Sequence, residues 1–419
     1  MPQTEEQTVV IISDSAVVDG GAAKVALQTA KVLTDAGYTV IYFAGGSEAD
    51  SYYLRGVDVR LVNKDSLRHS KNRVSAALNG IFDKNVYREL FFLLDKLNKK
   101  NSIVHVHSWA SVLSPSIFRA IYNAEIPCVV TAHDYCLGCP NSCLYDFTKC
   151  EICRRYPLSP SCILHDCDRD SYLVKLFRIL RYRSQLRELR KLKPGIIFVS
   201  NFQKDKLEPL LRFKMASFVV RNPIEGSFEN LEENKRASET CRFLYVGRVE
   251  AEKGVDLFCK AALRLGCEAI VLGDGKERAS LQKQFSGMKF KGWATKDDVI
   301  DAMRESTALV IPSRWYEASP LTPIEAMMNA ALPCIVADSC AAVDDVIDGV
   351  TGCVFESGST SSLVKAMEIA EEMECGLRKK IVASSKDLAK ARSFEEYLKN
   401  LRWVYSETIS RKTHGSKLV

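Results

Sequence analysis

The chain lacks any apolar run that approaches the roughly 18 residues a membrane-spanning helix requires. The first residues, Met1 to Glu6, are polar and acidic and lead directly into an apolar run, so no signal peptide is expected. A strong charge of one sign is also missing, since 58 Lys and Arg against 52 Asp and Glu leave a net charge of +6. Nucleic-acid-binding proteins usually carry a strong basic stripe within a recognisable module, and no such module is recognised in the sequence. We therefore expect a cytoplasmic protein without a nucleic-acid partner.

The composition is that of a folded protein with more than one domain. Of the 419 residues, 47% are hydrophobic and 26% are charged, close to globular averages. A single core rarely serves a chain of this length, so two domains of about 200 residues each are expected. Apolar runs alternate with helical patterns, which is typical of parallel sheets covered by helices. The expected strands are Thr8–Ser13, Thr39–Phe43, Ile103–His107, Cys128–Ala132, Ile196–Ser200, Phe243–Gly247, Ala269–Gly273, Ala308–Pro312 and Cys334–Ala337.

A break in the pattern divides the chain. Proline and glycine occur in Val220–Ser227, and the charge-rich stretch Glu229–Arg236 follows. We therefore place one α/β domain at 1–220 and a second at 221–393. The remaining segment, 394–419, begins with an amphipathic pattern over Phe394–Tyr405, which predicts a helix. The short basic tail after it is expected to be disordered.

Two glutamates eight positions apart, Glu317 and Glu325, follow one of the expected strands. Glu317 falls in the loop after this strand, and Glu325 falls in the first turn of a helix that starts near Leu321, Thr322 and Pro323. Open α/β sheets bind their ligands at this edge. Amides at a helix start can hold a diphosphate, and carboxylates can accept hydrogen bonds from hydroxyl groups on either side of it. A sugar nucleotide fits this pattern, but Thr322 and Glu325 also fit a capping box that only stabilises their own helix.

Residues after neighbouring strands fit the same ligand. Arg248 and Lys253 follow a strand and can reach a diphosphate, unless they are solvated surface cations. Gly273 begins a tight turn that lets the backbone approach a ligand. Gly292 and Trp293 follow a short strand, where backbone groups can contact a base, although Trp293 fits a core position equally well.

In combination these residues resemble the C-terminal domain of the family 4 glycosyltransferases. The resemblance implies an α/β fold of the GT-B class, with two Rossmann-like domains facing across a cleft and a C-terminal helix crossing back to the first domain. It implies that Arg248 and Lys253 hold the donor diphosphate, that Glu325 holds the ribose, and that Glu317 faces the donor sugar. The chain departs from the family at Cys340-Ala341, where relatives usually carry glycines. The matching series is Tyr245–Arg248, Lys253-Gly254, Gly273–Gly275, Gly292-Trp293, Pro312-Ser313, the E-x7-E pair Glu317 and Glu325, and Asp348–Gly352.

The first domain carries candidates for the acceptor side. His133 and Asp134 follow a buried strand, and the resemblance places His133 near the reacting sugar and Asp134 beside the acceptor. Ser200, at the end of another strand, matches the family at the edge of the cleft. His105 and His107 alternate along a strand, so one is expected to face the core and the other the cleft, both in structural roles.

A glycine pair and the implied mechanism complete the functional prediction. Gly20 and Gly21 lie between the first strand and the first helix, where they form either a loop that approaches a phosphate or sugar, or a simple turn. The resemblance implies a retaining transferase in which cations and a helix start stabilise the leaving diphosphate, with no cofactor or metal for catalysis. The donor is expected to be a UDP- or GDP-sugar. The acceptor is expected to be a glycan or lipid-linked glycan, in cell-envelope or exopolysaccharide biosynthesis. The alternative is a non-catalytic module that binds sugar nucleotides or glycans as an interaction protein.

Cysteines are concentrated in one segment. Eight of the fifteen lie between Cys128 and Cys167, and two C-x-x-C pairs among them have the spacing of metal ligands. The segment 134–170 is poor in core residues, so we interpret it as an insert that a structural zinc would stabilise. Reduced, unliganded thiols and an iron–sulfur cluster are the alternatives. The candidate ligands are Cys139, Cys150, Cys153, Cys162 and Cys167.

A basic helix is predicted after the insert. Residues 175–193 contain eight basic residues and one acid, interleaved with leucine, isoleucine and phenylalanine. Such a helix can lie on anionic lipid at the inner face of the membrane, which would suit a lipid-linked acceptor. An ordinary amphipathic surface helix is the alternative.

Overall fold

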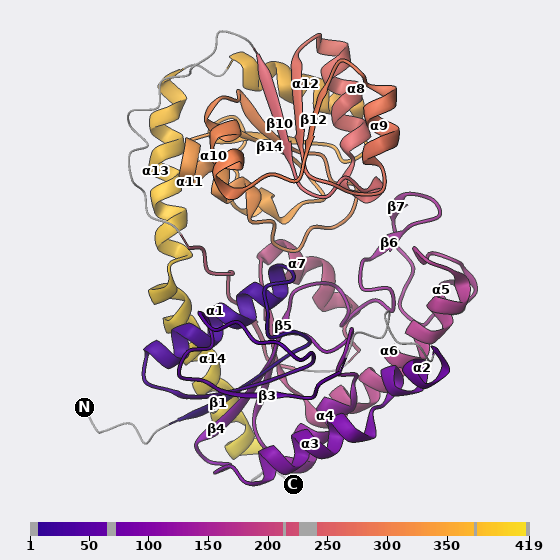
Figure 1. The fold of residues 1–419 in the computed structure, drawn as a ribbon, viewed down its shortest axis with the longest axis vertical. Coiled ribbons are helices and arrows are strands. Elements are labelled where there is room, and N and C mark those ends of the chain that lie inside the picture. The colour runs from indigo at the N-terminus through magenta and orange to yellow at the C-terminus, as the bar shows by residue number, and fades with distance from the viewer. Residues whose placement is uncertain (1–6, 65–72, 213–214, 226–240, 373–374, 416–419) are drawn as a thin grey trace.

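The computed structural model describes residues 7–64, 73–212, 215–225, 241–372 and 375–415. Two α/β lobes lie one above the other in Figure 1, and each is built on a sheet whose strand pairs are parallel. The N-terminal sheet has the strand order β3 (Asp58–Leu61), β2 (Thr39–Ala44), β1 (Thr8–Ser13), β4 (Ser102–Val106), β5 (Cys128–Ala132), β8 (Gly195–Phe198) and β9 (Ser217–Val219). The C-terminal sheet has the order β12 (Lys289–Gly292), β11 (Glu268–Leu272), β10 (Arg242–Val246), β13 (Ala308–Ile311), β14 (Cys334–Ala337) and β15 (Gly352–Phe355).

Helices cover both faces of each sheet, so each lobe has two apolar cores. One N-terminal core lies under α3 (Lys84–Asp95), α4 (Ser116–Ala124) and α6 (Tyr172–Leu192), and the other under α1 (Gly21–Asp35). In the C-terminal lobe, α8 (Val255–Leu265), α9 (Arg278–Gln284) and α12 (Thr360–Glu372) cover one face. The opposite face is covered by α10 (Lys296–Arg304), α11 (Thr322–Ala330) and α13 (Cys375–Ala391). Two short helices, α2 (Arg73–Ile81) and α7 (Asn201–Leu207), complete the N-terminal lobe.

The predicted architecture of two α/β domains, each with a parallel sheet covered by helices, is confirmed. Central strands such as β1, β4 and β13 are almost entirely buried, which explains why they appear in the sequence as continuous apolar runs rather than alternating ones. Each expected strand is present to within about two residues at its ends. Among the strands of these two sheets, β3, β9 and β15 were not predicted, and they are only three or four residues long. The connection at 226–240, which includes the whole charge-rich stretch, lies outside the described residues, so the boundary at 220/221 stays a prediction.

The C-terminal helix α14 (Phe394–Gly415) crosses back to the N-terminal lobe, as predicted (Figure 1). Its buried residues Leu401 and Val404 join the core that α1 covers. The hydroxyl groups of Thr29 on α1 and Tyr397 on α14 share a hydrogen bond of 2.8 Å. The helix continues to Gly415, so the prediction of a disordered tail directly after Tyr405 is wrong for residues 406–415.

The cysteine-rich insert has little regular structure. It contains the antiparallel pair β6 (Tyr145–Asp146) and β7 (Glu151–Ile152), followed by α5 (Pro160–Leu164). Figure 1 shows β6 and β7 beside the lower edge of the C-terminal lobe, at the opposite side of the molecule from α13 and α14. Among the helices of the described ranges, none is both long enough and apolar enough to cross a bilayer.

Candidate active site

The predicted C-terminal site lies where the strand order of its sheet reverses. β10 pairs with β11 on one side and with β13 on the other, so the connections that follow β10 and β13 leave in opposite directions. A crevice opens at the carboxyl ends of the strands at such a point, and ligands of open α/β sheets bind there. Arg248 and Lys253 follow β10, and Glu317 follows β13. The topology therefore brings together Lys253 and Glu317, which are 64 positions apart in the sequence.

Lys253 and Glu317 form a largely buried ion pair. Lys253 Nζ lies 2.5 Å from Glu317 Oε1, and Ser313 Oγ donates a 2.6 Å hydrogen bond to the same oxygen. Burial alone would raise the pKa of Glu317, but the Lys253 ammonium and the hydrogen bond from Ser313 outweigh it and hold the pKa below its usual value. Glu317 is therefore ionised at neutral pH, and the alternative that Lys253 is a solvated surface cation is wrong.

Glycines allow the loops of this site to pack directly on one another. Gly254 follows Lys253 with φ of 70°, and a Cβ atom there would lie 1.9 Å from the carbonyl oxygen of Pro312. Gly273, with φ of 137°, would place a Cβ atom 1.9 Å from the carbonyl oxygen of Gly247. Any side chain at either position would force the loops apart. Glycine at 273 was predicted because a turn there would let the backbone approach a ligand. The structure adds a second reason, which is the close contact of Gly273 with the backbone of Gly247.

Arg248 and Glu325 are the more accessible charges. The Arg248 side chain is 53% exposed, and its Nη2 lies 3.9 Å from Oε1 of Glu252. Glu325 is partly exposed in the first turn of α11, and its carboxylate has no hydrogen-bond or ion-pair partner among the described residues. The N-cap of α11 is Leu321, without a side-chain hydrogen bond, and Thr322 is the first helical residue. The capping box proposed for Thr322 and Glu325 is therefore wrong.

Gly292 and Trp293 lie beside the same crevice. The backbone amide of Gly273 donates a 2.7 Å hydrogen bond to the carbonyl oxygen of Gly292, which ties the ends of β11 and β12 together. Trp293 is 88% exposed, so the alternative of a core position is wrong. Its indole is accessible for contact with a planar ligand.

Three histidines line up at the carboxyl ends of β4 and β5. Nδ1 of His107 and Nε2 of His133 share a hydrogen bond of 2.9 Å, and their rings stack with centroids 5.2 Å apart. Behind them, His105 bonds to Thr131 and to Tyr405 of α14, both at 2.7 Å. Burial lowers the pKa of His105 to about 3 and that of His133 to about 4, and it holds the pKa of His107 well below its usual value. These imidazoles are therefore neutral at neutral pH.

The histidine prediction was right in outline and incomplete in detail. His105 faces the core, and His107 supports His133 rather than facing the cleft by itself. His133 is partly exposed, and its Nδ1 has no hydrogen-bond partner in the described part of the chain. Asp134 beside it is exposed, and one carboxylate oxygen accepts a 2.7 Å hydrogen bond from the amide of Cys136. Both side chains are thus accessible at the top of the N-terminal sheet.

Ser200 links the two lobes. Its Oγ accepts a hydrogen bond from the amide of Gln203, which caps α7, and donates a 2.7 Å hydrogen bond to the carbonyl oxygen of Ala318. Ser200 is buried, with 3% exposure, so its hydroxyl group holds the segment after Glu317 against the N-terminal lobe. Its contact with an acceptor stays a prediction.

Gly20 and Gly21 begin α1. Gly20 is the N-cap and Gly21 the first helical residue, and both are exposed. A Cβ atom on either residue would meet nothing within 4 Å, so no packing contact requires glycine there. A role in approaching a ligand stays a prediction.

Two family models match the chain. Residues 19–225 match the model described as Glycosyltransferase Family 4, and residues 227–388 match the one described as Glycosyl transferases group 1. Together they account for most of the sequence, with the division between them inside the connection that separates the two sheets. The chain belongs to the family 4 glycosyltransferases.

Several proteins are similar to this family 4 glycosyltransferase. An uncharacterized glycosyltransferase of Methanocaldococcus jannaschii is 28% identical over 218 residues, which are 51% of this chain and 59% of that protein. The alpha-D-kanosaminyltransferase of Streptomyces kanamyceticus is 29% identical over 136 residues, 30% of this chain and 35% of that protein. The chain thus matches less than two thirds of the length of either relative. The crystal structure of Anabaena HepE in complex with UDP shares the GT-B fold, with a TM-score of 0.64 and 15% identity over 96% of this chain and 100% of that one.

The insert of this family 4 glycosyltransferase brings together four of the five cysteines proposed as zinc ligands. Cys139, Cys153, Cys162 and Cys167 line one small cavity, whereas Cys150 is exposed and lies outside it. Burial raises the pKa of the Cys139 thiol to about 12 and that of Cys167 to about 11, so these thiols are protonated in the absence of an ion. In the described ranges, no group of three or more His, Cys, Asp or Glu side chains is arranged to hold a metal ion.

The predicted basic helix, α6, has several cations that bind groups within the protein. Lys175 is 1% exposed, and its ammonium group donates to the carbonyl oxygens of Cys162 and His165. Arg178 forms ion pairs with the insert, and Arg181 donates a 2.7 Å hydrogen bond to the carbonyl oxygen of Ala110. These contacts favour an ordinary packed helix over a surface that lies on lipid. Contact with anionic lipid stays a prediction, now limited to the exposed cations near Arg190.

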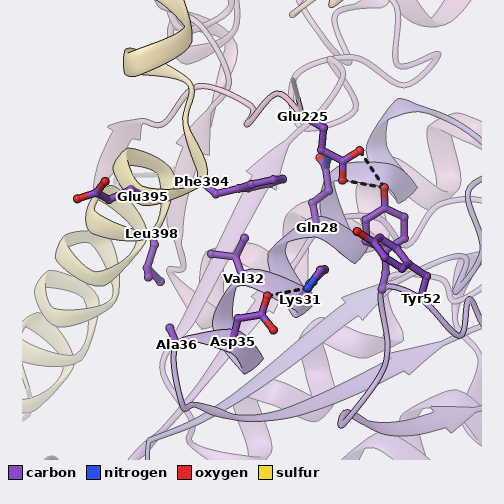
Figure 2. A pocket seen from close by; sticks show the side chains of 11 residues that line it. Gln28, Lys31, Val32, Asp35, Ala36, Tyr52, Glu225, Phe394, Glu395 and Leu398 are labelled. Atoms are coloured by element: carbon purple, nitrogen blue, oxygen red, sulfur yellow. Dashed lines mark hydrogen bonds and ion pairs between the residues drawn. The ribbon is translucent and has the colours of Figure 1, made fainter. Parts of the chain in front are cut away.

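A cavity of about 620 Å³ lies away from the predicted site, between α1, the start of α14 and Glu225 (Figure 2). The Tyr53 hydroxyl donates a 2.9 Å hydrogen bond to the Glu225 carboxylate. Figure 2 shows Lys31 paired with Asp35. None of the residues predicted from the sequence to bind donor or acceptor lines this cavity.

Proposed function

We propose that the chain is a retaining glycosyltransferase that moves a sugar from a UDP- or GDP-sugar to a glycan or lipid-linked glycan. The observation that carries the proposal is the position of the Lys253–Glu317 ion pair at the switch point of the C-terminal sheet. The accessible Arg248 lies on the loop that also carries Lys253, and Glu325 lies in the first turn of the helix that follows Glu317. The UDP held by the GT-B protein HepE, of similar fold, supports a nucleoside diphosphate as ligand.

Each charged group has a role that fits its surroundings. Glu325 is ready to accept hydrogen bonds from the ribose hydroxyls, because no protein group occupies its carboxylate within the described residues. Arg248 and Lys253 hold the diphosphate, Arg248 through a bidentate contact and Lys253 as a point charge. Trp293 and the backbone of Gly292 lie beside the base. Glu317, ionised and fixed by Lys253 and Ser313, accepts hydrogen bonds from hydroxyl groups of the donor sugar.

In the reaction we propose, the acceptor approaches the face of the sugar from which the diphosphate departs. The acceptor oxygen bonds to the anomeric carbon while the bond from that carbon to the diphosphate oxygen breaks, and the acceptor proton passes to the leaving phosphate oxygen. Arg248, Lys253 and the N-terminus of α11 stabilise the negative charge that grows on the diphosphate. Because these groups supply the positive charge, the mechanism uses no metal ion or cofactor besides the nucleotide sugar.

His133 acts as a neutral hydrogen-bonding group in this scheme. Its Nε2 is held by His107, which fixes the ring and leaves Nδ1 for a hydroxyl group of the donor sugar. A protonated imidazole there would meet developing positive charge at the anomeric carbon. Its low pKa of about 4 avoids this at neutral pH. Asp134, next to it and exposed, is proposed to contact the acceptor.

Donor turnover tests the proposal. The purified chain is incubated with UDP-, GDP- and ADP-sugars and a broad mixture of glycan and lipid-linked acceptors, and release of nucleoside diphosphate is measured. We expect release with at least one donor, strongly reduced in Glu317→Gln and unchanged in Arg304→Ala, which alters only a surface ion pair. Binding of a donor without any release would instead support the non-catalytic module. Retention is read from the anomeric configuration of the product.

We also propose that cysteines of the insert bind a structural zinc ion. This proposal is supported by the four cysteines that share one small cavity, and it requires their thiols to turn toward a common centre and lose their protons. Metal analysis of protein purified under reducing conditions is expected to give about one zinc per chain, and Cys162→Ser should lose it. Less than about a tenth of an equivalent of zinc, with the chain folded, would remove the proposal.

A further inference from the structure

The cysteine-rich insert of the N-terminal lobe contacts the loop that carries Arg248 and Lys253. Arg169, at the end of the insert, forms an ion pair with Glu252, which lies between those two residues in the sequence. Glu252 belongs to the 3-10 turn η2 (Ala251–Lys253) that follows β10. The contact therefore joins the N-terminal lobe to the proposed diphosphate-binding loop of the C-terminal lobe.

The insert holds Arg169 in place from both sides. Asp168 and Asp170, its neighbours in the sequence, both pair with Arg178 of α6, at 3.0 and 3.1 Å. The Arg169 guanidinium also lies over the ring of Phe147, 4.6 Å from its centroid. Because its two neighbours form ion pairs with α6, the backbone at Arg169 is held in a position from which its side chain contacts Glu252.

Glu252 is a buried carboxylate with two competing cations. Its side chain is 2% exposed, against 26% for Arg169 and 53% for Arg248. Arg169 contacts its Oε1 directly, while Arg248 Nη2 stands 3.9 Å from the same oxygen. A buried carboxylate requires a paired cation, and Glu252 already has one in Arg169. Arg248 is thereby left with an accessible guanidinium.

We propose that Arg169 is a positioning residue that neutralises Glu252 and so keeps Arg248 available for the donor diphosphate. The inference rests on the proposed function, because it assumes that Arg248 binds the diphosphate. Without Arg169, the unpaired charge of Glu252 draws Arg248 in, since the two side chains are already 3.9 Å apart. The insert thus acts on donor binding from the opposite lobe, without itself touching the donor.

Nucleotide binding to the full chain provides the test. Affinities are measured by calorimetry for UDP, GDP and the parent nucleosides uridine and guanosine, which lack the diphosphate. We expect Arg169→Ala to weaken binding of the preferred diphosphate by at least about tenfold, because it leaves a buried carboxylate without its partner. Affinity for the nucleoside should stay within about twofold, since the base and ribose contacts lie elsewhere.

A second substitution separates positioning from a general structural defect. Glu252→Gln removes the charge that captures Arg248, so the double variant Arg169→Ala, Glu252→Gln should regain diphosphate affinity to within about threefold of wild type. Arg169→Lys should be intermediate, and Arg304→Ala, which breaks an exposed Arg–Asp pair, should match wild type.

The outcomes distinguish this inference from the proposed function. Unchanged diphosphate affinity in Arg169→Ala would overturn the inference, as would equal losses for diphosphate and nucleoside or a double variant no better than the single one. The proposed function is tested separately by Arg248→Ala. If that variant binds the diphosphate as tightly as wild type, or if wild type binds no nucleotide, the proposed donor site itself is wrong.

Discussion

Glu317 and Glu325 belong to one sequence motif but differ in their surroundings. Glu317 is ionised and bonded to Lys253 and Ser313, with its side chain only 12% exposed, whereas Glu325 has no partner in the described ranges. A group whose bonds are already made has a fixed position, and one without partners is available to a ligand. This contrast supports the proposed division, in which Glu325 binds the nucleotide and Glu317 the sugar.

The neutral histidines give a prediction on stability and pH. His133 has a folded pKa of about 4 against 6.5 for the free side chain. As the pH falls below 6.5, His133 therefore becomes protonated in the unfolded chain, whereas in the folded chain it stays neutral down to about pH 4. We expect the free energy of unfolding, measured by urea denaturation, to decrease over this window, and to decrease less steeply in His133→Gln. Equal slopes for both proteins would show that His133 is not held neutral.

The sequence could identify these residues only in part. Arg248, Lys253, Glu317 and Glu325 were predicted because strands, helix starts and motif spacing placed them at one edge of a sheet. Glu252 was missed, since a glutamate in a charged loop gives no sign that it will be buried by an arginine 83 positions away. The support of His133 by His107 was also missed, because it depends on how two neighbouring strands pair.

At the scale of elements, the sequence pattern predicted strands that are buried along their whole length. It did not predict features that depend on tertiary contacts. Buried parallel strands such as β13 and β14 were predicted from their apolar runs. Thr322 was predicted to cap α11, but the N-cap is Leu321, one residue earlier, and Thr322 is the first helical residue. Trp293 illustrates the same limit, because an aromatic residue after a strand fits a core or a ligand contact, and only the tertiary fold leaves it exposed.

The contact of the crossing helix α14 with the N-terminal lobe leads to a prediction on stability. The Tyr405 hydroxyl bonds to Nδ1 of His105 inside the N-terminal lobe, and Tyr405 is 1% exposed. Tyr405→Phe leaves that ring nitrogen unpaired in an apolar environment, so we expect a loss of about 1 to 3 kcal/mol in the free energy of unfolding. Chemical denaturation measures it, with the exposed Tyr122→Phe as matched control. A loss no larger than that of the control would contradict the docking of α14 through His105.

At the scale of the whole molecule, the two lobes meet at several points around the proposed site. Tyr316 packs against Tyr135 and Phe202, with ring centroids 6.0 and 5.7 Å away. The amide of Phe202 donates a 3.1 Å hydrogen bond to Asp344 in η3 (Ala341–Asp344), which adds to the Ser200 contact with Ala318. Together with the Arg169–Glu252 pair, these contacts join the two lobes. The family's usual glycines at Cys340-Ala341 are replaced by residues that are buried here.

The central claim is that the C-terminal lobe binds a nucleoside diphosphate through Glu325, and direct binding of UDP and GDP tests it. Calorimetry on the full chain should show binding of at least one of them. Glu325→Ala should weaken it by roughly 10- to 100-fold, the cost of losing hydrogen bonds to a charged group. Glu368→Ala, an exposed glutamate on α12 of the same lobe, should bind as wild type. An affinity for the preferred nucleotide that is the same in Glu325→Ala as in wild type would contradict the account.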